Sequence, residues 1–138
     1  MVDKPKLDQM LSNLRQFLTV LRNLAALSRK AFLADADKVG NAKYHLVIAI
    51  ECCIDVANHI IASENYRFPR DNSDSFAVLV EQGVLPAESR EPLRAMARFR
   101  NRLVHLYWDV DDAKVHEYLQ DGLGDIERFG NAIARHVW

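Results

Sequence analysis

Hydrophobic residues recur at helical spacing along the first part of the chain. From Leu7 onward they occupy positions 7, 11, 14, 18, 21 and 25, in alternating steps of four and three, and Met10, Phe17 and Leu24 widen the same stripe. Residues spaced in this way lie on one face of an α-helix. The pattern predicts a long amphipathic helix that ends before a polar interruption at residues 35–40.

A second helix is predicted to begin within or just after this interruption and to run to about Asn65. Hydrophobic residues cover two opposite faces of it. One face carries Val47, Ile50, Ile54, Ala57 and Ile61, and the other carries Ala49, Cys52, Cys53, Val56 and Ile60. A helix that is apolar nearly all round has little surface left for water, so we expect this helix to be central in the fold.

Polar residues form one narrow wedge on this otherwise apolar helix. Glu51, Asp55 and His59 follow one another at intervals of four, which places them in a row, and Asn58 lies beside them. Ionisable groups on a buried helix need partners, because an unpaired buried charge costs several kcal/mol. Two interpretations stay open. The row belongs either to a salt-bridge network or polar dimer seam, or to the lining of a functional cleft.

The next segment carries loop signals and is followed by two further helices. Residues 65–75, NYRFPRDNSDS, are rich in Asn, Ser and Asp and contain a proline. A short helix is predicted from about Ser73 to Gln82, with Gly83 as a C-terminal cap. A fourth helix is predicted to open at residues 86–89.

The fourth predicted helix carries arginines at regular spacing. Arg90, Arg94, Arg98 and Arg102 recur every four residues. We hypothesise that this row packs against the acidic row of the second helix, where its guanidinium groups would pair with carboxylates.

Aspartates open the last predicted helix. Asp109, Asp111 and Asp112 are N-cap candidates for a helix that runs toward Trp138, although glycines at positions 122, 124 and 130 weaken the prediction in its middle. The sequence shows no sustained alternation typical of strands. It therefore predicts an all-α fold, an up-and-down bundle of four to five helices, in a single domain that spans residues 1–138.

Composition and charge narrow the classes of function. Hydrophobic residues make up 49% of the 138 residues and charged residues 27%, which is typical of a folded helical protein and not of a disordered one. The formal net charge of -1 argues against a strongly basic protein that coats duplex nucleic acid. It leaves room for a local basic patch that grips RNA phosphates.

Cysteine usage and the N-terminus bear on location. Cys52 and Cys53 are adjacent in an apolar run, where a mutual disulfide would be strained, so we interpret them as core residues. The first ten residues lack the apolar segment of a signal peptide, and no apolar run approaches the length that spans a bilayer. The scattered histidines show no metal-ligand spacing. We therefore expect a cytoplasmic protein with no membrane association, no metal and no cofactor.

The stretch FRNRLVHLYW, residues 99–108, places polar residues where a bundle helix should be apolar. On a helical wheel Leu93, Met96, Arg100, Leu103 and Tyr107 share one stripe. Asn101 and His105 share a different face, and in an ideal helix Arg100 and His105 are about 140° apart. Joint action would need the helix to end or unwind before His105, or a second subunit to complete the site across a two-fold axis.

This stretch resembles a known signature. Arg100, His105 and Tyr107, with Asn101 directly after the arginine, match the R-x4-H-x-Y pattern of HepT-type toxins in the HEPN superfamily. The segments IAIECCIDVANHIIA, the Arg-Phe-Pro of the following loop, FAVLVEQGVL and MARFRNRLVHLYWDVD also resemble the family pattern, in order and at family spacing. One departure is Leu106, where many relatives have glycine, which makes the backbone near Tyr107 less permissive.

The resemblance implies a fold, an activity and a partner. It implies a homodimeric helical bundle whose signature residues meet in a cleft between subunits. The partner is a cognate nucleotidyltransferase antitoxin of the MntA type, which blocks the toxin by transferring AMP from ATP to the signature tyrosine. Carried over to this sequence, Arg100 and His105 are the catalytic pair of a metal-independent ribonuclease. Asn101 is then a positioning residue and Tyr107 the AMPylation site.

These residue types suit that chemistry. RNA carries its own nucleophile in the 2′-hydroxyl, and histidine titrates near neutral pH, so His105 is suited to accept or donate a proton. Arg100 supplies a permanent positive charge for the crowded phosphate, and Arg98 and Arg102 add phosphate contacts. An AMP group on Tyr107 would add bulk and negative charge beside the arginines that RNA needs.

Other interpretations stay open. In one, the dimer is a non-catalytic nucleotide-binding or scaffolding subunit that binds the transferase and only presents Tyr107. In another it is a plain structural dimer, with His105 paired to a helix end and Tyr107 packed against Trp108.

Overall fold

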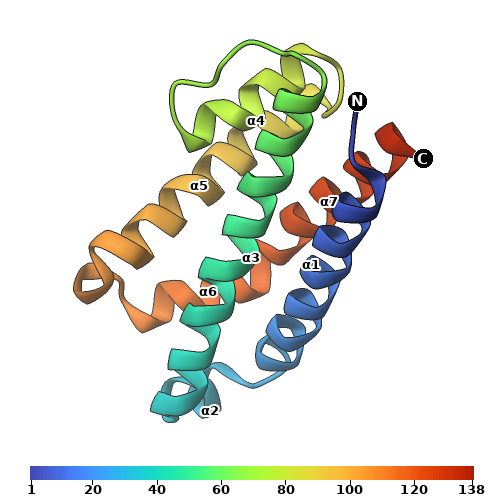
Figure 1. Ribbon diagram of the computed structural model, residues 1–138. Coiled ribbons are helices and arrows are strands. Elements are labelled where there is room, and N and C mark those ends of the chain that lie inside the picture. Colours follow the sequence, from blue (N-terminus) through green and yellow to red (C-terminus); the bar gives the residue numbers. More distant parts are fainter.

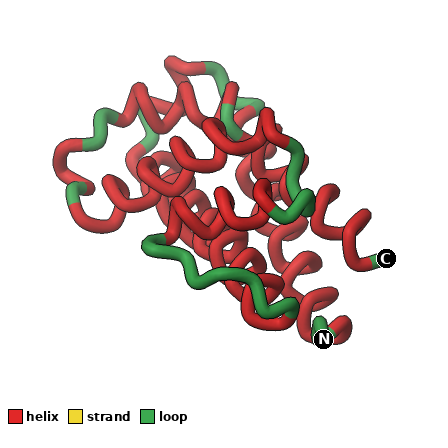
Figure 2. The backbone as a smooth tube through the Cα atoms, turned by 90° about the horizontal axis from the view of Figure 1, so that it is seen from above, coloured by secondary structure: helices red, strands yellow, loops and turns green.

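In the computed structural model the chain forms an all-α bundle, which confirms the predicted fold class (Figure 1). The structure describes the backbone of residues 1–138 and every side chain except that of Tyr107. The α-helices are α1 (Lys4–Ala25), α2 (Arg29–Leu33), α3 (Ala36–Ser63), α4 (Asn72–Glu81), α5 (Arg90–His105), α6 (Asp112–Asp121) and α7 (Leu123–Val137). Short 3-10 helices, η1 (Ala87–Ser89) and η2 (Tyr107–Asp109), flank α5. Viewed from above, the connections run along the outside of the packed helices (Figure 2).

The central helix is α3, as its apolar faces predict. It contacts α1, α2, α4, α5, α6 and α7. In Figure 1 it runs through the middle of the bundle, with α4 and α5 on one side and α1 and α7 on the other. Its buried residues include Leu46, Ile50 and Ile60, and they belong to the same hydrophobic core as the leucine stripe of α1.

Its length and composition alone would allow α3 to cross a membrane. The expectation that no apolar segment approaches that length is therefore wrong by this criterion. Its place in the fold explains the composition, because a helix with neighbours on nearly every side needs apolar residues on nearly every side.

Aspartate and serine side chains fix where several helices begin. The side chains of Asp3, Ser28, Asp35, Asp71 and Asp111 each accept a hydrogen bond from a backbone N–H in the first turn that follows. Such caps satisfy N–H groups that have no partner within the helix. Of the three aspartates considered for the last part of the chain, Asp111 is the cap.

Two features of the chain differ from the predicted elements. The last predicted helix is divided at Gly122 into α6 and α7. A Cβ atom at Gly122 would lie 2.6 Å from the ring of Tyr118, so a larger residue does not fit this close approach without movement. Helix α2 was not predicted, because its five residues are too few to show a period and bury only Phe32.

The cap after α4 gives a test of backbone conformation. Gly83 has φ of 75°, and a Cβ there would meet no atom within 4 Å, so Gly83→Ala acts through the backbone alone. We expect it to lower the free energy of unfolding by about 1 kcal/mol, because L-residues disfavour this region. Gly40→Ala in α3, which also has open space, should raise it by roughly 0.5–1 kcal/mol. Urea denaturation measures both, and shifts of the same sign would contradict the argument.

Candidate functional site

Arg100 joins α5 to α3. Its Nη2 atom donates a 2.6 Å hydrogen bond to Oε1 of Glu51, and its Nη1 atom donates a 3.1 Å hydrogen bond to Oδ1 of Asn101. The Arg100 side chain is only 18% exposed, whereas that of Glu51 is 41% exposed. The Nε atom of Arg100 is buried and has no partner among the described residues. Hydrogen bonds at both terminal nitrogens therefore hold the guanidinium plane in place, and three of its five N–H donors, the buried Nε–H among them, are not used in these two bonds.

The sequence of α5 explains why this arginine is half-buried. Leu93, Met96, Ala97 and Leu103 are the buried residues of the helix, and Arg100 lies on the same stripe. A charge in that position needs an opposite charge, because desolvation disfavours an unpaired one. Glu51 on the polar wedge of α3 provides it.

Asp55 is the second carboxylate that Arg100 influences. It lies one helical turn beyond Glu51 on α3 and is exposed. Desolvation raises the pKa of Asp55, the charge of Glu51 raises it further, and the charge of Arg100 lowers it. The arginine thus faces two carboxylates, and the closer one, Glu51, forms the hydrogen bond.

His59, the third member of the polar row, contacts another part of the chain. Its Nε2 atom accepts a 3.4 Å hydrogen bond from the backbone N–H of Asp3. Near it, the N-terminal ammonium of Met1 donates to the carbonyl oxygen of Ser63 at 2.8 Å. The structure therefore brings Glu51 and Asp55 to α5, whereas His59 lies against the N-terminal segment.

The hypothesis that the arginine row packs against the acidic row is wrong. Arg90, Arg94, Arg98 and Arg102 are all exposed. A row at intervals of four drifts by about 40° per step around an α-helix, so it leaves the buried stripe, which alternates steps of three and four. Helices α3 and α5 do lie side by side, but the arginine between them is Arg100.

The end of α5 separates His105 from Tyr107. Leu106 is the C-cap, with φ of −133° and ψ of 40°, and its N–H donates to the carbonyl of Arg102 at 2.8 Å. His105 is thus the last helical residue, and Tyr107 begins η2 instead of continuing the α5 stripe as the wheel assumed. Since φ at Leu106 is negative, the turn at this position does not require glycine. The predicted role of Tyr107 lies outside the described side chains.

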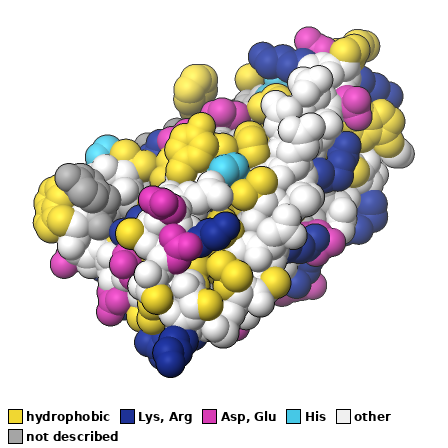
Figure 3. All heavy atoms as spheres, turned by 90° about the horizontal axis from the view of Figure 1, so that it is seen from below, with side chains coloured by type: hydrophobic (Ala, Val, Ile, Leu, Met, Phe, Trp, Pro, Cys, Tyr) yellow, Lys and Arg dark blue, Asp and Glu magenta, His cyan; other side chains and the backbone are white. Residues whose placement is uncertain are grey.

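His105 and Asn101 are both exposed, as expected for two residues that share the outer face of α5. Apolar residues lie next to them, since Val104, Leu106 and Trp108 are 40%, 42% and 70% exposed. Acidic, basic and exposed hydrophobic side chains also lie next to one another on the face seen from below (Figure 3). Within one copy of the chain, Arg100 points toward α3 while His105 is exposed at the helix end.

The two cysteines behave as core residues. Cys53 is buried, and the thiol of half-buried Cys52 donates to the carbonyl of Met10 at 3.3 Å. Burial, with a smaller effect of Asp55, raises the pKa of Cys52 to about 11. A thiol with so high a pKa stays protonated and is a poor nucleophile. Among the described side chains, no group of three or more His, Cys, Asp or Glu residues is placed to hold a metal ion.

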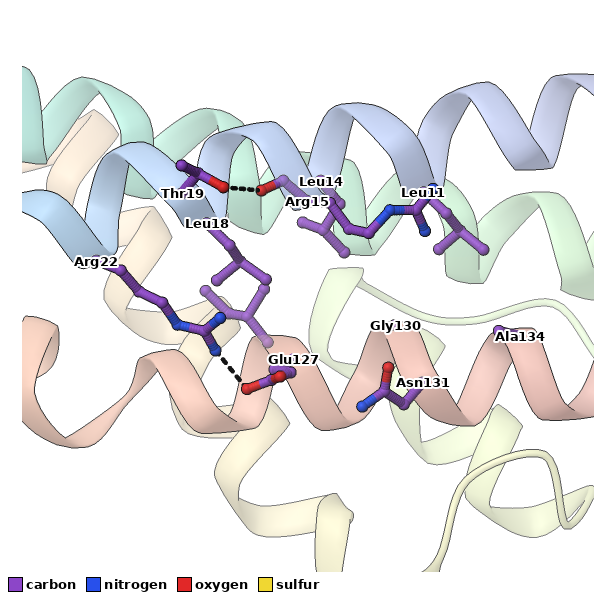
Figure 4. Close-up of a pocket in the computed structure, with 11 residues that line it drawn as sticks. Leu11, Leu14, Arg15, Leu18, Thr19, Arg22, Glu127, Gly130, Asn131 and Ala134 are labelled. Atoms are coloured by element: carbon purple, nitrogen blue, oxygen red, sulfur yellow. Dashed lines mark hydrogen bonds and ion pairs between the residues drawn. The ribbon is translucent and has the colours of Figure 1, made fainter.

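A separate hollow lies between α1 and α7, on the side of α3 away from α5 in Figure 1. Its volume is about 290 Å³. Figure 4 shows leucines of α1 along its wall and the ion pair between Arg22 and Glu127 across one end. Both partners of that pair are half-exposed, so it is an ordinary surface contact. Arg100, Asn101 and His105 are not among the described residues that line this hollow.

Comparison with known proteins gives a family match over nearly the whole chain. The model of the HepT-like family, described as "Ribonuclease HepT-like", matches residues 7–133. A curated relative, the mRNA nuclease HepT of Shewanella oneidensis, is 32% identical over 83 residues, which are 60% of this chain. The chain spans 62% of the length of that relative.

Solved structures share the fold. A tri-AMPylated HEPN toxin of Shewanella oneidensis in complex with MNT antitoxin has a TM-score of 0.87 and 24% identity, and the match covers 98% of this chain and 99% of that chain. A toxin–antitoxin with AMP-PNP has a TM-score of 0.86 and 22% identity, and the match covers 94% of this chain and 97% of that chain. YutE of Bacillus subtilis, a cytosolic protein of unknown function, has a TM-score of 0.86 and 18% identity. That match covers 99% of this chain and 91% of YutE.

Proposed function

Because the chain belongs to the HepT-like ribonuclease family, we propose that it is the toxin of a toxin–antitoxin pair and cuts RNA. The observation that carries the proposal is the placement of the signature residues. Arg100 is hydrogen-bonded to Glu51, and His105 is exposed at the end of the same helix. A positive charge and a side chain that accepts and donates a proton are the two groups that RNA cleavage by its own 2′-hydroxyl needs.

In the proposed reaction the 2′-oxygen attacks the adjacent phosphorus, and the bond from phosphorus to the 5′-oxygen breaks. The products are a 2′,3′-cyclic phosphate and a free 5′-hydroxyl. His105 moves the proton, and Arg100 stabilises the negative charge that gathers on the non-bridging oxygens. Asn101, hydrogen-bonded to Arg100, holds the orientation of the guanidinium.

The active form is a homodimer in this proposal. Arg100 and His105 are about 140° apart around α5 in helical geometry, so one copy does not direct both at one phosphate. A second copy related by a two-fold axis supplies a second set of the same residues. The exposed Val104, Leu106 and Trp108 beside His105 give such a contact apolar surface to bury.

The partner is a nucleotidyltransferase antitoxin that adds AMP to Tyr107. Solved toxins with the same fold include a tri-AMPylated HEPN toxin in complex with MNT antitoxin, which supports this assignment. Tyr107 follows the end of α5, where an added phosphate would compete with RNA for Arg102 and Arg98. RNA as substrate and ATP as the AMP donor place the protein in the cytoplasm in this proposal.

Two measurements on purified protein test the proposal together. The chain should cut single-stranded RNA in the presence of EDTA and leave 2′,3′-cyclic phosphate ends. After incubation with the partner and ATP, its intact mass should rise in AMP-sized steps and cleavage should stop, whereas Tyr107→Phe should gain no such mass. AMPylation without any RNA cleavage by the unmodified protein would contradict the nuclease and favour the scaffolding interpretation.

A further inference from the structure

Arginines form a ridge along the solvent side of α5 that extends well beyond the reacting residues. Arg90, Arg94, Arg98 and Arg102 are exposed and recur at one-turn intervals from the first residue of α5 to its last turn. From residue 92 to residue 108 the sequence contains no acidic residue, although the chain has a formal net charge of -1. Positive charge is therefore concentrated on this helix.

The ion pairs along the ridge are weak. Arg94 lies 3.5 Å from Glu91, and Arg102 lies 3.6 Å from Asp109. The acidic side chains of these pairs are 77% and 66% exposed. Both distances exceed the roughly 2.7–2.9 Å of a charge-assisted hydrogen bond, and exposed pairs contribute little to stability. A phosphate group is therefore able to displace either carboxylate.

The spacing and rotation of the four arginines of the ridge suit a flexible single strand of RNA. Twelve helical steps separate Arg90 from Arg102, which is a rise of about 18 Å. Successive arginines are also rotated by about 40°, so the ridge winds around α5. A single strand can bend to present successive phosphates to such a row, whereas a stiff duplex cannot follow the curve. The path leads to His105, at the C-terminal end of the same helix.

We propose that Arg90, Arg94, Arg98 and Arg102 form a phosphate track, which holds single-stranded RNA along α5 and directs it to His105. This proposal rests on the proposed ribonuclease function. It extends the RNA contacts from Arg98 and Arg102 to the far end of the helix, and it makes single-stranded RNA the preferred substrate class.

Carboxylates mark the far end of the phosphate track. Arg90 and Arg94 themselves line a hollow of about 240 Å³, together with Arg70, Asp71, Ser73, Asp74 and Ala77. The pKa of Asp74 lies well below its usual range, because its carboxylate accepts hydrogen bonds from the side chain of Arg67 and, with a smaller effect, from the backbone N–H of Arg70. Backbone and hydroxyl hydrogen bonds lower the pKa of Asp71 as well. Both carboxylates stay ionised and lower the positive potential at this end of α5, so the track offers at most four phosphate contacts, one for each guanidinium.

Salt-dependent binding to protein that cannot cleave tests the track. In a His105→Ala background, the binding of a long single-stranded RNA is compared with and without Arg90→Gln and Arg94→Gln. We expect the slope of log K against log salt concentration to fall by about 1.4, since each single-strand phosphate contact contributes about 0.7. The matched control, Arg15→Gln with Arg135→Gln, removes two exposed arginines of α1 and α7 and should keep the original slope.

Cleavage kinetics give a second readout, which a merely structural role would not move. In otherwise wild-type protein, Arg90→Gln with Arg94→Gln should raise KM more than it lowers kcat. The rise should be larger for a long RNA than for an oligonucleotide too short to reach Arg94. A general loss of folding would affect both substrates alike.

Each other outcome overturns a different claim. If the His105→Ala protein binds RNA and the double variant keeps its salt slope, the track is wrong but the ribonuclease proposal stands. If the double variant keeps RNA binding but loses the nucleotidyltransferase, the ridge is a protein-docking surface and the track is wrong. If unmodified protein neither binds nor cuts any RNA, the proposed function itself fails.

Discussion

Replacing His105 with alanine is expected to lower RNA cleavage by roughly 10²- to 10⁴-fold, the usual contribution of a positioned general acid or base. The side chain is exposed at the end of α5, so its removal should leave the fold intact. Cleavage of a labelled single-stranded RNA measures the effect, and growth inhibition by the expressed chain should disappear in parallel.

A second histidine serves as the matched control. His136 is exposed near the end of α7, as His105 is at the end of α5, but it belongs to no signature. His136→Ala should therefore cut RNA at the wild-type rate. A His105→Ala protein that retains wild-type cleavage and toxicity would remove His105 from the reaction and leave the scaffolding interpretation in its place.

The sequence carried enough information to find the fold and the central helix. The stripe of α1 and the two apolar faces of α3 are strong signals, because burial on one side or on nearly all sides imposes a spacing that few other structures share. The cap at Gly83 followed from a residue type with a known backbone preference, whereas the predicted start of α4, at about Ser73, lies one residue after its observed start at Asn72. The division at Gly122 was suggested by glycine but not located, because it depends on the close approach of the Tyr118 ring.

The pairing of charges could not be predicted in the same way. Four arginines at regular spacing looked like the natural partners of Glu51 and Asp55, yet the pair forms with Arg100. The wheel contained the deciding signal, since Arg100 lies on the buried stripe and the other four do not. Desolvation makes an unpaired charge more costly at a half-buried position than at an exposed one. Candidate ion pairs should therefore be ranked by the expected burial of each charge first, and by their spacing in the sequence second.

The turn after α5 could not be predicted from the sequence either. The wheel continued the helix through Tyr107, but the helix ends at His105 and Leu106 takes a non-helical conformation. Neither glycine nor proline marks this end. The N–H of Leu106 makes the last α-helical hydrogen bond, to the carbonyl of Arg102, and the carbonyl of Leu106 then accepts from the N–H of Asp109 in a 3-10 turn. These are backbone contacts that any residue type can make.

The second large effect is expected at Arg100. Arg100→Ala should lower cleavage by roughly 10²- to 10³-fold, because in the proposed reaction its positive charge stabilises the negative charge on the non-bridging oxygens. Arg100→Lys should restore little of this, since one ammonium group cannot replace a fork whose two nitrogens are bound separately by Glu51 and Asn101. The control is Arg22→Ala, which removes an arginine paired with Glu127 on the far side of α3 and should leave cleavage at the wild-type rate.

Stability measurements on the same ion pair separate positioning from folding, because its two partners differ in burial. Removing Arg100 leaves Glu51, which is 41% exposed and is readily hydrated, so the free energy of unfolding should change little. Removing Glu51 instead leaves a guanidinium that is only 18% exposed and whose buried Nε already has no partner among the described side chains, so Glu51→Ala should cost roughly 1–3 kcal/mol. If Arg100→Ala abolishes cleavage at nearly unchanged stability, while Glu51→Ala destabilises the protein, Arg100 acts on the substrate and Glu51 acts on Arg100. The reverse order of stabilities would mean that the pair serves mainly to hold α3 and α5 together.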